Sequence, residues 1–62
     1  MRTNCYFLDL NDATANVIRL IALTVPCFIS LEASKDETYG AYTIEAREED
    51  WAWIESKLAP II

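Results

Sequence analysis

The sequence contains no histidine, a single glycine and only two cysteines among its 62 residues. Serine and cysteine nucleophiles normally need a histidine as general base, and this chain has no histidine to activate them. Gly40 alone makes no glycine-rich loop of the kind that cradles phosphate. Cys5 and Cys27 cannot supply a paired-cysteine zinc motif, and histidine-containing zinc motifs are excluded as well. We therefore expect a non-catalytic protein that holds no metal and no cofactor.

Basic residues are also few, and the net charge is −5. The five basic residues are scattered along the chain, at Arg2, Arg19, Lys35, Arg47 and Lys57. Direct nucleic-acid binding depends on a basic patch that contacts phosphates, so we expect none. An acidic mimic of nucleic acid stays an alternative, and it requires carboxylates spaced on one face.

Targeting and membrane signals are missing from the sequence as well. The opening "MRTNCYFLDL" has polar residues where a signal peptide has an apolar run. The most apolar stretch, "VIRLIALTVPCFISL", is interrupted by Arg19, Thr24 and Pro26 and is too short to cross a bilayer. We expect a soluble, cytoplasmic protein with reduced thiols and no membrane contact. Both cysteines are expected to be buried structural residues.

Apolar residues are abundant, at 53% of the chain. A single domain spanning residues 1–62 buries only about 60% of its unfolded surface, which is marginal for stability. Chains of this size usually need disulfides, a metal or a partner subunit. We therefore expect some apolar surface to contact another chain.

The first half of the chain predicts a strand followed by a helix. In residues 4–10, alternation places Tyr6 and Leu8 on one face and Cys5 and Phe7 on the other. The helix begins after Asp12, which is the expected N-cap, and ends before Pro26. Its predicted core stripe contains Val17, Leu20, Ile21 and Thr24, with Ile18 and Val25 beside it and Leu23 on the opposite side.

The second half predicts a hairpin followed by a helix. Residues 27–34 and 40–47 alternate as two strands around the loop "SKDETYG", with Ile29, Leu31, Tyr42 and Ile44 facing inward. Three acidic residues, 48–50, open the last helix, where they meet the positive end of the helix dipole. The core stripe of this helix is Trp51, Ile54 and Leu58, whereas Trp53 points roughly 200° away from Trp51; Pro60 ends the helix.

The order strand, helix, strand, strand, helix predicts an α+β two-layer sandwich. Three antiparallel strands form the sheet, and both helices cover one of its faces. This is a ferredoxin-like plan, β-α-β-β-α-β, without its last strand. The hairpin face with Ile29, Leu31, Tyr42 and Ile44 is expected to lie under Val17, Ile21, Trp51, Ile54 and Leu58.

Three segments resemble the ACT domain, a small regulatory module of amino-acid metabolism. They are "LNDATANVIRLIALTVPCFISLEAS", "TYGAYTIEA" and "WAWIESKLAPI". The resemblance implies a regulatory domain that takes an amino-acid ligand at the loop before the first helix, which here contains Asn11 and Asp12. ACT domains usually have a glycine where this loop enters the helix, and residues 13–16 of this chain contain none. A turn plus an N-cap is the alternative role of Asn11 and Asp12.

Without a fourth strand, the first strand is expected to have a free edge of unpaired amides and carbonyls. No lysine or proline blunts the edge within "CYFL". We expect a homodimer, or a protein partner, to continue the sheet or cover this edge. The candidate interface residues are Phe7, Leu23, Trp53, Ile61 and Ile62.

The sequence thus predicts a non-catalytic regulatory or protein-interaction module, homodimeric and ACT-like. The alternative is a small acidic inhibitor, of phage or host-defence type, that occupies the surface of a partner protein. Carboxylate pairs such as Asp9 with Asp12, or Glu32 with Glu45, are interpreted as solvated surface acids rather than as a catalytic pair.

Overall fold

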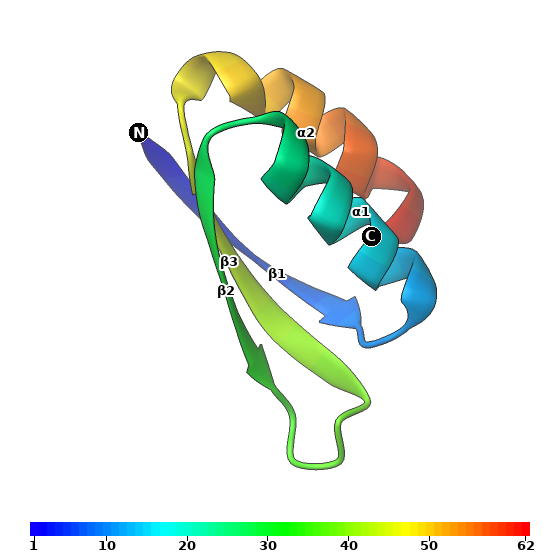
Figure 1. Ribbon diagram of the computed structural model, residues 1–62. Helices are drawn as coiled ribbons and strands as arrows, with labels where there is room; N and C mark the ends of the chain where they lie inside the picture. The colour runs from blue at the N-terminus through cyan, green and yellow to red at the C-terminus, as the bar shows by residue number, and fades with distance from the viewer.

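The computed structural model describes residues 1–62 (Figure 1). The chain forms β1 (Arg2–Asp9), α1 (Asp12–Thr24), β2 (Cys27–Ala33), β3 (Tyr39–Ala46), a 3-10 turn η1 (Glu48–Asp50), α2 (Trp51–Leu58) and a second 3-10 turn η2 (Ala59–Ile61). The predicted α+β fold is confirmed, because every expected strand and helix is present with only slightly shifted bounds.

The three strands form one antiparallel sheet in the order β1-β3-β2. Cys5 lies opposite Thr43, and Phe7 lies opposite Ala41. On the other side of β3, Thr43 lies opposite Ser30. The free edge predicted for the first strand is therefore present, since β1 pairs with β3 on one side only.

One face of this sheet forms the core together with both helices. Alternation places Leu8, Tyr42, Ile44 and Ala46 on the inner face, where all four are buried. The helices contribute their own buried residues to the same cluster, namely Ile21, Trp51, Ile54 and Leu58. Figure 1 shows α1 and α2 next to each other on one side of the strands. The predicted two-layer arrangement is therefore the observed one.

Helix α1 differs from the prediction in its cap and in its buried stripe. The N-cap is Asn11 rather than Asp12, because the Asn11 side chain accepts a hydrogen bond from the Thr14 amide at 2.9 Å. Asp12 is instead the first helical residue. Thr14 and Ile21 are the buried residues of α1, whereas Leu20 and Thr24 are exposed. The core side of α1 is thus rotated away from the predicted stripe, toward Ile18 and Val25.

Helix α2 follows the prediction closely. Trp51, Ile54 and Leu58 are all fully buried, as their spacing predicted. The acidic residues 48–50 differ from the prediction, because they form a separate 3-10 turn before α2 and the first turn of α2 contains no acidic residue. Arg47 donates to Asp50 across this 3-10 turn at 2.8 Å. Helix α2 ends at Leu58, and Pro60 lies in η2 directly after it.

An anchor formed by Arg2 ties the first strand to the last helix. Its guanidinium donates to Glu48 at 3.0 Å and to Glu55 at 2.7 Å, and it lies 4.7 Å from the centre of the Trp51 ring. The Trp51 indole N–H in turn donates to the backbone carbonyls of Arg2 and Ala46. These contacts fix α2 over the beginning of β1 and the end of β3.

The β2–β3 hairpin extends beyond the helices, as Figure 1 shows. Leu31 is 50% exposed and Ala33 is also exposed, so the expectation that the helices cover Leu31 is wrong. Helix α1 has 13 residues and is only about 20 Å long, whereas the molecule extends over 35 Å. The helices therefore reach the part of the hairpin near Ile29 and leave its loop end uncovered.

The hairpin loop is held by its own side chains. Ser34 donates to the Asp36 carboxylate at 2.8 Å, and the Thr38 amide donates to both side chains. These hydrogen bonds lower the pKa of Asp36, with the Ser34 hydroxyl as the largest cause. Glu37 has a φ of 58°, in the left-handed region that glycine usually occupies.

Candidate interaction surface

The face of the sheet opposite the helices is uncovered, and we call it the outer face. Phe7 on β1 is 76% exposed, and Phe28 on β2 is 73% exposed. The two rings do not form one cluster, because Phe7 lies opposite Ala41 and Phe28 lies opposite Glu45, four residues away on β3. Exposed aromatic side chains on an uncovered sheet face are candidates for contact with a partner. The outer face consists of Thr3, Cys5, Phe7 and Asp9 of β1, Tyr39, Ala41, Thr43 and Glu45 of β3, and Phe28, Ser30 and Glu32 of β2.

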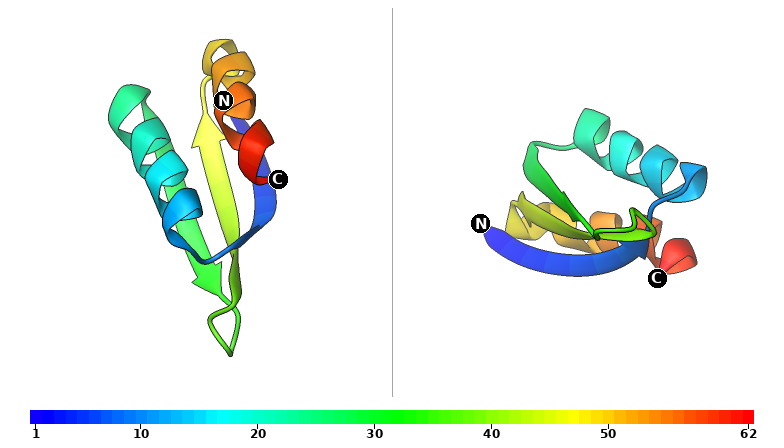
Figure 2. Two further views of the ribbon diagram at one scale, coloured as in Figure 1. Left: turned by 90° about the vertical axis from the view of Figure 1, so that its right-hand side faces the viewer. Right: turned by 90° about the horizontal axis from the view of Figure 1, so that it is seen from below.

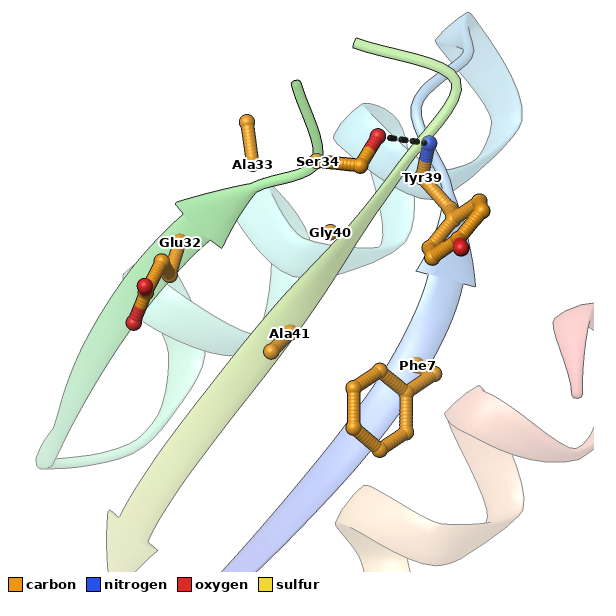
Figure 3. A pocket seen from close by; sticks show the side chains of 7 residues that line it. All are labelled: Phe7, Glu32, Ala33, Ser34, Tyr39, Gly40 and Ala41. Carbon is orange, nitrogen blue, oxygen red and sulfur yellow. Dashed lines mark hydrogen bonds between the residues drawn. The ribbon is translucent and has the colours of Figure 1, made fainter. Parts of the chain in front are cut away.

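A hollow of about 310 Å³ lies on the outer face, near the loop end of the hairpin. Its residues are Phe7, Glu32, Ala33, Ser34, Tyr39, Gly40 and Ala41, and we call it the Ala41 hollow. Figure 3 shows Phe7 and Tyr39 on one side of Ala41 and Glu32 on the other. The hollow exists because Ala41 is small, whereas its neighbours across the sheet, Phe7 and Glu32, are large.

The backbone of β1 presents hydrogen-bonding groups that have no partner. The Leu10 amide donates to the Thr38 carbonyl, which identifies the even-numbered residues of β1 as those whose backbone groups face β3. The amides and carbonyls of Thr3, Cys5 and Phe7 therefore point away from the sheet, and none of them bonds within the chain. In the right-hand view of Figure 2, β1 forms a margin of the molecule.

The predicted interface residues do not form one patch. Phe7 is exposed on the outer face, whereas Trp53 is half-buried on the helix layer, where Lys57 lies 5.7 Å from its ring. Leu23 is 80% exposed on α1, which also belongs to the helix layer. Ile61 packs against the core, and Ile62 is exposed. Only Phe7 lies on the free edge of β1.

Asn11 and Asp12, the predicted ligand-binding residues, lie at the turn between β1 and α1. Asn11 borders a hollow of about 380 Å³, whose other residues are Asp9, Ala13, Thr14, Pro60, Ile61 and Ile62. The Asn11 side-chain oxygen is already engaged by the Thr14 amide, as expected for a cap. Asp12 is exposed and does not border this hollow. Amino-acid binding at this turn stays a prediction.

The two cysteines differ from the expectation of buried thiols. Cys5 is exposed because it occupies an outward position of β1, and Cys27 is half-buried at the start of β2. Both are free thiols. Burial, and to a lesser extent the nearby Asp50 carboxylate, raises the pKa of the Cys27 thiol. No group of three or more His, Cys, Asp or Glu residues is placed to hold a metal ion.

The Ala41 hollow was not predicted as a site. The alternation in residues 27–34 predicts the outward position of Glu32, but no pattern in the sequence relates Glu32 to Phe7 or Tyr39. The signal for the hollow is a small residue, Ala41, at an outward position beside Phe7. This signal can be recognised only when the register between β1 and β3 is known, because the register places Ala41 opposite Phe7.

No protein-family model, no curated protein and no solved structure matches the chain. The ACT-type resemblance accordingly stays a prediction. The longest helix, α1, is too short to cross a membrane, and no other helix of the structure meets that requirement either.

Proposed function

We propose that this chain is a non-catalytic protein-interaction module that assembles as a homodimer through the free edge of β1. The observation that supports the proposal is the row of unpartnered amides and carbonyls at Thr3, Cys5 and Phe7. A second copy, turned by a two-fold axis, offers the same groups in antiparallel order. Pairing the two edges continues the three-stranded sheet into a six-stranded one.

Electrostatics favour this edge for self-association. The chain carries a net charge of −5, so two copies repel each other over most of their surface. Along β1, Asp9 is the only acidic residue, and Arg2 is already engaged by Glu48 and Glu55. Between these ends, the edge presents only uncharged residues. This part of the edge contains no lysine or proline, the residues that usually prevent an edge strand from pairing with another chain.

We also propose a regulatory role, which depends on the ACT-type resemblance. The observed order β-α-β-β-α is compatible with such a domain lacking its last strand. We propose that a dimer of this kind acts by binding another protein rather than by catalysis.

A small acidic inhibitor is the second candidate. It is favoured by the outer face, where the strand positions include Asp9, Glu32 and Glu45 and no basic residue. A surface of this charge complements a basic surface on a target protein. The two candidates differ in self-association, because an inhibitor that binds through the outer face does not require a dimer.

Light scattering on two matched variants tests the dimer. Phe7 and Phe28 are both outward-facing phenylalanines of nearly equal exposure, but they lie on opposite edges of the sheet. We expect Phe7→Lys to lower the mass from twice 7.1 kDa toward 7.1 kDa, because lysine blunts the paired edge, and Phe28→Lys to leave the dimer intact. A wild-type protein that stays monomeric over the whole micromolar range, or an equal loss of the dimer in both variants, would contradict the proposal.

A further inference from the structure

The Ala41 hollow has walls of two different chemical kinds. Phe7, Ala41 and Glu32 lie in one row across β1, β3 and β2. Neighbouring strands are about 4.8 Å apart, so the aromatic and acidic walls stand roughly 10 Å apart. Tyr39, two residues before Ala41 on the same face of β3, adds a second ring beside Phe7 (Figure 3). A long, flat side chain with a charged end matches this space.

Both walls are available to a ligand. Phe7 and Tyr39 are exposed, and their rings make no cation–π contact within the chain. The Glu32 carboxylate is exposed and takes part in no ion pair or side-chain hydrogen bond. Aromatic faces attract cations, and a guanidinium can stack on a ring while it donates to a carboxylate.

The occupant is expected to come from a different protein. Of the three arginines, Arg2 and Arg47 are engaged by carboxylates of their own chain. Arg19 donates to the Asn16 side chain and lies on α1, in the helix layer rather than on the outer face. Two copies packed through their outer faces would oppose acidic surfaces, because this face carries Asp9, Glu32 and Glu45 without a basic residue at its strand positions. Charge complementarity therefore selects a basic partner.

From these observations, we propose that the Ala41 hollow binds an arginine side chain presented by a partner protein. The side chain lies over Ala41, its guanidinium stacks against Phe7 and Tyr39, and its N–H groups donate to Glu32. The inference rests on the proposed function as an interaction module and names what the module recognises. It does not depend on the β1 edge being paired.

A second hollow on the outer face provides an internal control. It is lined by Thr3, Phe28, Ile29, Ser30, Thr43 and Glu45. Its carboxylate differs from Glu32, because Glu45 already accepts a hydrogen bond from the Thr3 hydroxyl at 3.4 Å. It also has one aromatic ring where the Ala41 hollow has two.

The test is an NMR titration of the labelled protein with a short blocked Gly-Arg-Gly peptide at fixed low salt. We expect saturable amide shifts centred on Phe7, Glu32, Tyr39 and Ala41. The same peptide with citrulline in place of arginine keeps the shape and loses the charge, and it should bind at least fivefold more weakly. Glu32→Gln should weaken arginine binding about fivefold, whereas Glu45→Gln should change it less than twofold. Ala41→Leu, which fills the hollow, should abolish the shifts.

Equal binding of the arginine and citrulline peptides would overturn the inference. Equal effects of Glu32→Gln and Glu45→Gln would overturn it as well, since they would indicate non-specific attraction to an acidic surface. Light scattering on the same samples separates the two proposals. A monomer that still binds the peptide at Ala41 contradicts the edge-paired dimer alone, and a dimer that does not bind it contradicts only the arginine site.

Discussion

Proline substitutions at the two sheet edges probe the β1 pairing most selectively. The Cys5 amide points away from β3 and has no bond within the chain, so Cys5→Pro removes a donor that the isolated monomer does not use. Leu31 is the matched position on β2. Its amide also points away from β3, because the Ser34 amide donates to the Tyr39 carbonyl and so fixes the alternation along β2.

The expected loss in the free energy of dimerisation follows from the number of hydrogen bonds that Cys5→Pro removes. In a two-fold dimer, each copy contributes its Cys5 amide, so the substitution removes two bonds at about 1 kcal/mol each. A loss of about 2 kcal/mol raises the dissociation constant of the dimer roughly 30-fold. We expect Leu31→Pro to leave this constant unchanged within about twofold, since β2 takes no part in the pairing.

Sedimentation equilibrium over a range of concentrations measures both constants. Near-UV circular dichroism of the buried Trp51 verifies that each variant keeps its core. The reasoning is refuted if Leu31→Pro weakens the dimer and Cys5→Pro does not, because β2 is then the assembling edge. It is also refuted if both folded variants dimerise as well as the wild type.

Three further predictions concern stability. Ile54→Ala leaves a cavity in the fully buried core and should lower the free energy of unfolding by about 3 kcal/mol in urea titrations; a loss below about 1 kcal/mol would contradict the assigned packing. Glu37→Gly should raise the free energy of unfolding by about 0.5 kcal/mol, because glycine adopts the positive φ without strain. A destabilised variant would argue against that backbone conformation. The folded-state pKa of Asp36 lies below its usual 3.8, so its contribution is complete above that value and is lost as pH falls through the folded pKa. Thermal unfolding below about pH 4 should therefore depend less steeply on pH in Asp36→Asn, and identical slopes would contradict the role of the loop hydrogen bonds.

The order of elements and most of the core were predictable because they depend on periodicity. The spacing of Trp51, Ile54 and Leu58 places three large side chains on one helical face, and all three are buried. Alternation likewise identified the inner positions Tyr42 and Ile44. These patterns lie within single elements, so they identify the buried face of each helix or strand before its packing partners are known.

Features that depend on how elements meet were not predictable. Asn11 and Asp12 are both good cap residues, and only the bond from the Thr14 amide distinguishes them. Leu31 has an inner position, but the helices do not extend far enough to cover it. The Ala41 hollow requires the register of three strands, which no local pattern specifies.

Hydrogen exchange measured amide by amide tests the β1 edge most directly. At concentrations where light scattering gives a mass of 7.1 kDa, we expect the amides of Thr3, Cys5 and Phe7 to exchange without protection. At concentrations that give twice that mass, the same amides should become protected, while the Leu31 amide on β2 stays unprotected. Protection of the Thr3, Cys5 and Phe7 amides in the monomer, or a dimer in which these three amides remain unprotected, would contradict the account.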